Sequence, residues 1–458
     1  MSMTPQNIRF TLLCILLFNS HVLLAQHEGH DMSQHNAPMD PSKHSMSHAF
    51  SLNLPMSRNS SGTAWQPDAT SMYGYMLMTK KWDLMFHGSV FIRYNYQDVL
   101  KNASRAESLT DRIDAPNWFM MMAQRKVKQR GLFAFSAMLS LDELVMTEDG
   151  YPLLFQSGET FEGKPLVDRQ HPHDLFSGLS AAYTHMINQN TDITLYVGYP
   201  GEPALGPPAF MHRISTFNNP DAPLSHHWQD ASHINFGVAT IGIRYQIIKA
   251  EFSAFTGREP DENRYDFDKP RFDSYSYRLS VNPTENFSIQ VSQGFIKSPE
   301  ALESDENITR STASIMHSIV LGEKRHLSTS LIWGMNQKTE HKPEHSVLLE
   351  SNLQLNKTAV YGRYELIQKS AHELVLPQFE DETFWINAIT FGSNYNIVSV
   401  LNTNLKIGAQ ATLNVAPHDL EPYYGRVPLS LQAYLRLTPI NMNAHAKKHK
   451  KQNGSPHQ

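Results

Sequence analysis

Apolar and polar residues alternate along most of this chain with a period of two. Between residues 82 and 97, one set of alternate positions is apolar or aromatic and the other set is polar. The first set is Leu84, Phe86, Val90, Ile92, Tyr94 and Tyr96, and the second is His87, Ser89, Arg93, Asn95 and Gln97. A period of two is typical of a β-strand whose two faces differ in polarity.

The same alternation recurs often enough to predict about sixteen strands. Their expected ranges are 82–97, 116–126, 131–141, 175–187, 192–199, 234–247, 250–256, 272–282, 286–296, 311–320, 325–336, 346–355, 358–367, 383–396, 405–415 and 429–438. Many of these runs reach about 9 to 15 residues, which suits tilted strands that cross a membrane, whereas soluble strands average about five or six residues. No repeat of fixed period is visible, which argues against a propeller.

Two architectures accept this many amphipathic strands, a closed membrane barrel and a soluble all-β fold. The mean hydropathy of −0.41 is typical of a transmembrane barrel, because lipid-facing and lumen-facing residues cancel along each strand. The polar faces carry Arg93, Arg278, Lys406 and Arg436, and aromatic residues recur near the ends of runs, as at Trp82 and Trp118. We therefore predict an all-β fold, a transmembrane antiparallel β-barrel of about 16 strands over residues 65–440.

The N-terminal residues predict export. Arg9 precedes an apolar run from Phe10 to Phe18, and the pattern over residues 1–25 is that of a secretory signal peptide with cleavage after Ala25. The only cysteine, Cys14, lies inside this segment, so the mature chain is expected to contain no disulfide. The predicted location is the outer membrane of a Gram-negative cell, with membrane lipid as a partner. The net charge of −5 gives no indication of a nucleic-acid partner.

Residues 26–64 are predicted to form a disordered, His/Met-rich arm in the periplasm. The candidate metal ligands in the arm are His27, His30, Met32, His35, Met39, His44, Met46 and His48. Imidazole and thioether together suit copper, with zinc as the alternative. The competing interpretation is a solvated arm whose histidines are incidental. The tail at 441–458 is predicted to be a solvated basic end that also contains histidine.

Three motifs are concentrated between Asp168 and His233, within predicted long loops at 143–174 and 200–232. They are Asp168-Arg-Gln-His-Pro-His-Asp174, Gly201-Glu-Pro-Ala-Leu-Gly-Pro207 and His226-His-Trp-Gln-Asp230. Because Pro172 keeps the backbone extended, two histidines project to the same side, and the following aspartate could orient a ring. The candidate ligands of an ordered metal site are His171, His173, Asp174, His226, His227 and His233. The alternative is a polar network that fills the lumen.

A resemblance to known proteins rests on these motifs together with Trp65-Gln-Pro-Asp68, Gly158-Glu-Thr160 and Gly257-Arg-Glu-Pro-Asp-Glu262. Over residues 65 to about 370 the chain resembles a largely uncharacterised family of Gram-negative outer-membrane barrel proteins. That resemblance implies an outer-membrane place and supplies no established activity or ligand set. The His/Met arm ahead of a barrel resembles, in composition only, the outer-membrane copper-resistance B proteins.

The function predicted from the sequence is an outer-membrane barrel that handles metal ions, through copper binding, resistance or efflux. Its expected partners are metal ions and envelope efflux or metal-handling proteins, and an oligomer such as a trimer is left open. The alternatives are a general solute pore or structural barrel with a His-rich polar plug, and a metal-dependent hydrolase. An enzyme is less favoured because the chain has no Gly-x-Ser-x-Gly motif and the mature part has no cysteine, so no catalytic residue is assigned.

Overall fold

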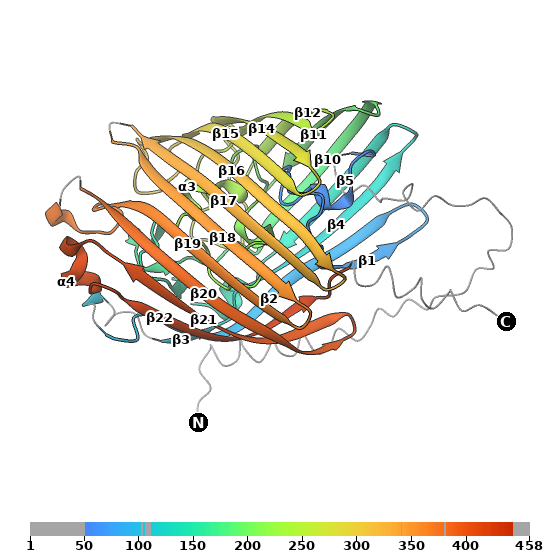
Figure 1. Ribbon diagram of the computed structural model, residues 1–458. Helices are drawn as coiled ribbons and strands as arrows, with labels where there is room; N and C mark the ends of the chain where they lie inside the picture. The colour runs from blue at the N-terminus through green and yellow to red at the C-terminus, as the bar shows by residue number, and fades with distance from the viewer. Residues whose placement is uncertain are drawn as a thin grey trace, which may run out of the picture. The chain divides into compact units, whose positions relative to one another are not determined.

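The computed structural model describes residues 51–442, except 102–103, 106–110, 148, 340 and 380–381. Sixteen antiparallel strands close into a β-barrel, which confirms the fold class predicted from the alternation (Figure 1). The strands of the wall are β2 (Asp83–Tyr96), β4 (Asn117–Val127), β5 (Gly131–Leu139), β10 (Phe176–Asn188), β11 (Thr191–Gly198), β12 (Val238–Tyr245), β13 (Ile248–Phe255), β14 (Ser274–Thr284), β15 (Phe287–Lys297), β16 (Asn307–Gly322), β17 (Arg325–Lys338), β18 (Glu344–Leu355), β19 (Thr358–Ser370), β20 (Thr383–Val400), β21 (Thr403–Val415) and β22 (Leu429–Pro439).

The barrel closes at β2, which pairs with β4 along its first half and with β22 along its second half. Two short strands complete this seam. β1 (Tyr75–Met78) pairs with the beginning of β2, and β3 (Arg112–Asp114) pairs with its end. β3 and β4 are separated at Pro116, which has no backbone N–H to donate to the ladder.

Short turns and long connections segregate to opposite ends of the barrel. The turns at one end join pairs such as β14 to β15 and β18 to β19. At the other end, residues 140–175 join β5 to β10, and residues 199–237 join β11 to β12. Both predicted motif-rich loops therefore start from the same end.

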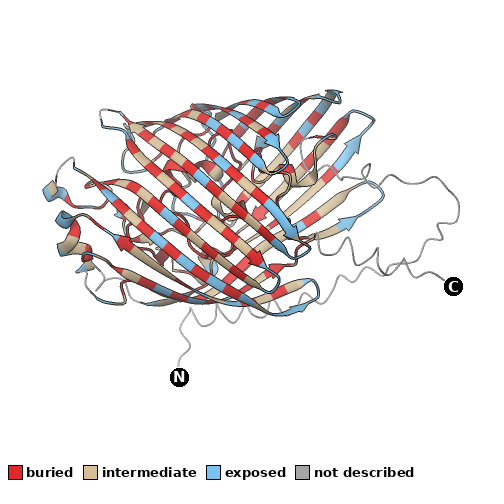
Figure 2. Ribbon diagram, in the orientation of Figure 1, coloured by how far each residue is buried: buried red, intermediate tan, exposed pale blue. Residues whose placement is uncertain are grey.

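Buried and exposed residues alternate along the strands of the wall, as the alternating colours in Figure 2 show. Along β12, buried and exposed residues alternate without a break. The outward set includes Ile241, which is 51% exposed, and Tyr245, whereas the inward set includes Thr240 and Arg244. The outer surface is thus apolar, and the polar face that the sequence predicted lines the lumen.

The helical elements are short, and among the described residues no helix is long and apolar enough to cross a membrane. The α-helices are α2 (Asp142–Val145), α3 (His226–Gln229) and α4 (Glu421–Tyr424), and the 3-10 turns are η2 (Met56–Arg58), η4 (Phe210–His212), η5 (Ala231–His233), η6 (Pro377–Phe379) and η7 (His418–Leu420). The β5–β10 connection also holds two small hairpins, β6 (Tyr151–Pro152) with β9 (Arg169–Gln170) and β7 (Glu159–Phe161) with β8 (Lys164–Leu166).

The β11–β12 connection, residues 199–237, folds into the lumen and forms a plug (Figure 1). Nearly all of its residues from Gly201 to Asp230 are buried. Arg213 of the plug donates from Nε to Glu350 of β18 at 2.7 Å and from Nη1 to Asp230 at 2.5 Å. Buried charges need such partners, and the inward polar face of the wall supplies them.

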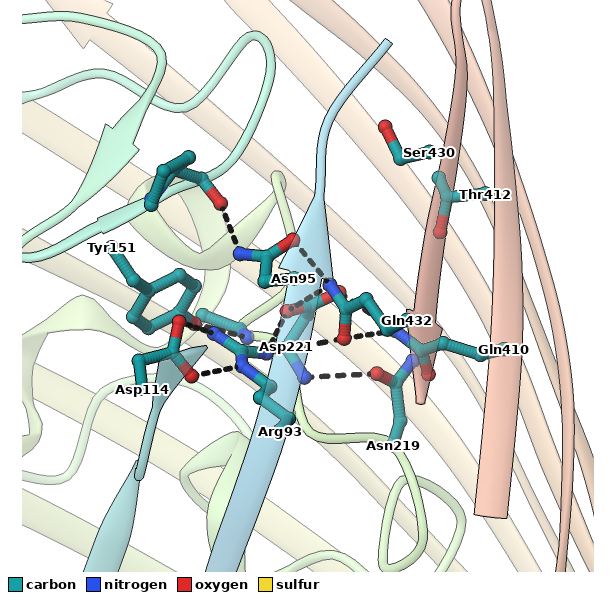
Figure 3. A network of polar contacts seen from close by, with 12 residues as sticks. Arg93, Asn95, Asp114, Tyr151, Asn219, Asp221, Gln410, Thr412, Ser430 and Gln432 are labelled. Carbon is teal, nitrogen blue, oxygen red and sulfur yellow. Dashed lines mark hydrogen bonds and ion pairs between the residues drawn. The ribbon is translucent and has the colours of Figure 1, made fainter. Parts of the chain in front are cut away.

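Asp221 attaches the plug to the seam of the barrel, as Figure 3 shows. Its carboxylate pairs with Arg93 of β2 and accepts hydrogen bonds from Gln410 of β21 at 2.7 Å and Gln432 of β22 at 2.9 Å. Arg93 also pairs with Asp114 of β3 at 2.5 Å. One plug residue therefore connects the first and last strands of the wall.

The predicted arm is too long at its C-terminal end, because residues 51–64 pack inside the barrel. Ser51 donates to Asp192 at 2.7 Å, close to the turn between β10 and β11. Trp65 is 4% exposed. The guanidinium of Arg58 lies 4.7 Å from its ring centroid, and the ammonium of Lys249 lies 4.9 Å from it. The polar composition of this segment predicted disorder. In the structure, inward-facing polar and charged side chains of the wall, such as Asp192 and Lys249, contact the segment and hold it in the lumen.

The other terminal predictions fall outside the described residues. These are the signal peptide at 1–25, the part of the arm up to residue 50 with all eight of its candidate ligands, and the basic tail beyond Met442. At the other end of the described chain, just after β22, Met442 donates a backbone hydrogen bond to Met72 at 2.9 Å.

Candidate metal centre

The plug and the β5–β10 connection bring five of the predicted histidines into one cluster. His226 and His227 belong to α3, His233 ends η5, and His171 and His173 follow β9. Neighbouring ring centroids are 5.0 Å apart for His226 and His233, 5.4 Å for His226 and His227, 5.6 Å for His173 and His233, 5.8 Å for His171 and His173, and 6.4 Å for His171 and His227. Two motifs that are more than 50 residues apart in sequence therefore share one place; whether they bind metal stays a prediction.

Local packing holds α3 at this position against the wall. Gly334 of β17 allows the close approach, because a Cβ atom there would lie 2.2 Å from the carbonyl oxygen of Trp228. Asn336, two residues further along β17, donates to the carbonyl oxygen of His227 at 3.0 Å. The histidines of α3 are thus fixed by a rigid strand.

Three side chains form what we call the outer trio: Glu159 of β7, His171 and His227. One ligand atom from each lies within 4.8 Å of the others. The Oε1 atom of Glu159 is 3.2 Å from Nδ1 of His171. Glu159 is not among the ligands predicted from the sequence, where its one signal is its place in the Gly158-Glu-Thr160 motif.

The remaining three histidines, His173, His226 and His233, form what we call the inner trio. Nδ1 of His173 lies 2.8 Å from Oδ2 of Asp142, and Nδ1 of His226 lies 2.6 Å from Oδ1 of Asp230. Nδ1 of His233 lies 3.0 Å from the backbone oxygen of Asp230. With Nδ1 donating to oxygen, the lone pair of each neutral ring is on Nε2.

The prediction that Asp174 orients a ring is wrong. Asp142 and Asp230 have that role, while the carboxylate of Asp174 lies 3.6 Å from the guanidinium of Arg264. Burial raises the pKa of Asp174 to about 6, against the opposing effect of Arg264. Sequence proximity to His173 suggested the contact, but the ion-pair partner of Asp174 is Arg264.

Three ring nitrogens of the cluster are buried without a hydrogen-bond partner among the described residues. They are the Nε2 atoms of His173, His227 and His233. Leaving a buried polar atom unpaired costs about 1–3 kcal/mol, so such atoms call for an explanation. Cations bound at the cluster would use such lone pairs.

The protonation state of the outer trio suits metal binding. Burial lowers the pKa of His171 and of His227 well below the usual range, and the neighbouring guanidinium of Arg264 adds to the effect at His171. Burial also raises the pKa of Glu159, and the nearby Glu259 contributes. Neutral imidazole is the form that ligates metal, and a cation would favour the ionised carboxylate of Glu159.

An acidic cavity of about 820 Å³, which we call the vestibule, adjoins the outer trio at Glu159. It lies among the β5–β10, β13–β14, β15–β16 and β19–β20 connections. Its acidic residues are Glu159, Glu259, Asp261, Glu262, Asp266, Asp268, Glu300, Glu303 and Glu373, against the basic residues Arg258, Lys269 and Arg271. This imbalance attracts cations. The charged Arg258–Glu262 segment of the Gly257–Glu262 motif thus lines a cavity.

We expect Gly158→Ala to weaken metal binding at the outer trio by about 10- to 100-fold, the effect typical of disturbing a ligand's support. A Cβ atom at Gly158 would lie 2.8 Å from Nδ1 of His227, and its φ of +105° favours glycine. The matched control is Gly163→Ala, in the same connection, with φ of +71° and nothing within 4 Å of an added Cβ atom. Equal affinities of the two variants for Zn(II), measured by chelator competition, would mean that the His227 contact is unimportant.

The fold and the cluster together define a class of protein, a closed β-barrel with a plugged lumen and a group of buried imidazoles beneath an acidic vestibule. No protein-family model matches the chain. No curated protein matches its sequence.

Solved outer-membrane barrels are similar to this chain at very low identity. The Salmonella typhi OmpF complex with daunomycin is 8% identical with a TM-score of 0.48, over 80% of this chain and 99% of that one. OmpTdeltaL8, a loop L8 deletion mutant of the Vibrio cholerae outer membrane protein OmpT, is 7% identical with a TM-score of 0.46, over 78% and 100%. The anion-selective porin from Comamonas acidovorans is 11% identical with a TM-score of 0.44, over 78% and 100%. These similarities assign neither a substrate nor a site residue to the chain.

Proposed function

We propose that this protein is an outer-membrane barrel that binds a transition-metal ion at the outer trio and handles such ions in the envelope. The observation that carries the proposal is the convergence of Glu159, His171 and His227 within 4.8 Å, with Nε2 of His227 buried and unpaired among the described residues. Two imidazoles and a carboxylate suit Cu(II), Zn(II) or Ni(II). Copper is the first candidate and zinc is the alternative. The arm ligands at 27–48 are part of the same proposal.

The outward apolar surface supports a place in the outer membrane. Exposed aliphatic and aromatic side chains recur on alternate positions of the wall, as on β12 and β14. In transmembrane barrels the short turns face the periplasm and the long loops face outward. By that rule the vestibule opens to the cell exterior, and Ser51, beside the short β10–β11 turn, is at the periplasmic end.

We expect Leu279→Arg to destabilise the barrel folded in lipid vesicles by about 2 kcal/mol, because a charge at mid-membrane depth is poorly solvated. Leu279 is at the centre of β14, is 44% exposed and pairs with Ala250 and Val291. The matched control is Thr284→Arg, at the turn end of the same strand, where the expected cost is about 0–1 kcal/mol. Equal losses for the two variants would contradict a lipid-facing wall.

We expect the double variant His171→Ala/His227→Ala to lose one bound metal ion per chain, with an affinity loss of 100-fold or more at that site. Mature protein refolded in detergent would be titrated with Cu(II), Cu(I) and Zn(II) against a competing chelator. The matched control is His341→Ala/His418→Ala, two loop histidines with side chains 50% and 90% exposed. If the two double variants retain the same number of ions, the outer trio is not a metal site.

The second candidate function is a structural barrel with a polar plug. The buried pairs of Arg213 with Asp230 and of Arg93 with Asp221 favour it, because they fill the lumen with satisfied charges. A protein that binds none of the tested ions, and whose cluster variants unfold more easily, would support this role.

A further inference from the structure

The inner trio is not used by the proposed ion at the outer trio. His173, His226 and His233 come from two different connections, yet the ring centroids of His226 and His233 are 5.0 Å apart and those of His173 and His233 are 5.6 Å apart. His226 is 1% exposed. Three imidazoles so close together in the interior need an explanation beyond apolar packing.

Each ring of the inner trio is oriented by an oxygen at Nδ1, from Asp142, the Asp230 side chain or the Asp230 backbone. This pattern, with Nδ1 held by oxygen and Nε2 left to the metal, is the usual support of metal-binding histidines. Asp142 is itself fixed, because the backbone N–H of Asn117 in β4 donates to it at 3.0 Å.

A purely structural polar network does not account for the free side of these rings. In such a network both nitrogens of a buried ring would be satisfied, but the Nε2 atoms of His173 and His233 are buried without a partner among the described residues. A cavity of about 60 Å³ borders His173, Phe210 and Met211 and provides space next to the trio.

We propose that the inner trio binds a second transition-metal ion, so that the cluster is a two-ion centre. The ligand atoms of the inner trio do not all lie within 4.8 Å of one another, as those of the outer trio do, so the ion would draw the three rings closer together. The inference rests on the proposed function of the outer trio and extends it. His226 and His227 are consecutive residues with rings 5.4 Å apart, and they belong to different trios, as do His171 and His173 at 5.8 Å. The β5–β10 connection thus gives two ligands to the outer ion and one to the inner ion, and the β11–β12 connection gives one to the outer ion and two to the inner ion. The outer ion adjoins the vestibule, and the inner ion adjoins the smaller cavity in the lumen.

The test compares the number of Cu(II) ions bound by the intact mature protein and by two double variants. We expect His173→Ala/His233→Ala and His171→Ala/His227→Ala each to lose one equivalent, and the combined variant to lose two. If the inner variant retains every ion while the outer variant loses one, the two-ion centre is overturned and the proposed function stands. If neither variant loses an ion, both proposals fail.

A measurement on the unmodified protein guards against variants that do not fold. Two Cu(II) ions held this close couple magnetically, so the electron paramagnetic resonance intensity per bound copper is expected to fall when the second equivalent enters the cluster. Full, uncoupled intensity at saturation would overturn the two-ion centre. His233→Gln, which retains a donor toward Asp230, is a milder variant. In this variant we expect the intensity per bound copper to show no coupling.

Discussion

Asp230→Ala is expected to destabilise the plug by about 3–5 kcal/mol, the cost typical of breaking a buried ion pair by removing one partner. Asp230 is 4% exposed and accepts from Arg213 at 2.5 Å and from His226 at 2.6 Å. Burial alone would raise the pKa of Asp230, but Arg213 and His226 hold it below its usual range, so the carboxylate is ionised. Its loss leaves Arg213 with Glu350 as its only carboxylate partner at Nε.

The effect would be measured as amide hydrogen exchange in residues 199–237. A loss of 3 kcal/mol corresponds to exchange faster by roughly 100-fold. Asp230→Asn keeps the shape and an acceptor oxygen, so we expect an intermediate acceleration. The same variant pair reports on the inner trio, because only the carboxylate fixes the tautomer of His226. Exchange unchanged in Asp230→Ala would show that this ion pair does not hold the plug.

The second large effect is a loss of stability between about pH 4.5 and pH 7 that depends on Glu202. This residue lies in the plug, is 6% exposed, and packs against Gly62 of the N-terminal segment. Burial raises the pKa of Glu202 from 4.5 to about 7, while Arg278 and Ser61 oppose the rise. A difference of this size corresponds to about 3 kcal/mol.

The sign follows from proton binding. Below pH 4.5 Glu202 is protonated in both the folded and the unfolded protein, and its contribution is fully present. As the pH rises, the unfolded chain ionises first, so folding stability decreases until the folded carboxyl also ionises near pH 7. The folded protein is therefore expected to be less stable at pH 8 than at pH 4.5 by this contribution.

The contribution of Glu202 can be isolated with Glu202→Gln. The free energy of unfolding of wild type minus that of the variant, measured by denaturant titration in detergent from pH 4 to 8, is expected to fall by about 3 kcal/mol. Glu285→Gln, in the exposed β14–β15 turn, is the control for the removal of a carboxyl group. A difference for Glu202→Gln that does not change with pH would mean that the carboxyl of Glu202 is not desolvated.

Most of the wall could be predicted because each strand carries its own evidence. Outward residues contact an apolar medium and inward residues a polar one, so a period of two marks a strand without knowledge of its neighbours. Errors occur where the wall meets the plug. The predicted strand at 234–247 begins only at Val238, because Asn235 pairs instead with Gly201 of the plug.

The candidate site was predicted only in part. Histidines in dense motifs are conspicuous, and His171 and His227 were named from them. Glu159 was not, because one carboxylate in a loop has no local pattern that distinguishes a ligand from a solvated residue. Asp174 was predicted to orient a ring because it is adjacent to His173 in sequence. The carboxylate that contacts His173 is that of Asp142 in α2, more than 30 residues earlier.

The sequence by itself determined that this chain forms a β-barrel of about sixteen strands and that its chemistry is concentrated between residues 168 and 233. Both are local properties, readable from the alternation and from the motifs. The tertiary structure alone decided that the β11–β12 connection and residues 51–72 fill the lumen, and which side chains meet there. The physical reason is that buried charges are stabilised by partners on distant strands, as Asp221 is by Arg93 and Gln410, and such pairings leave no trace in local sequence.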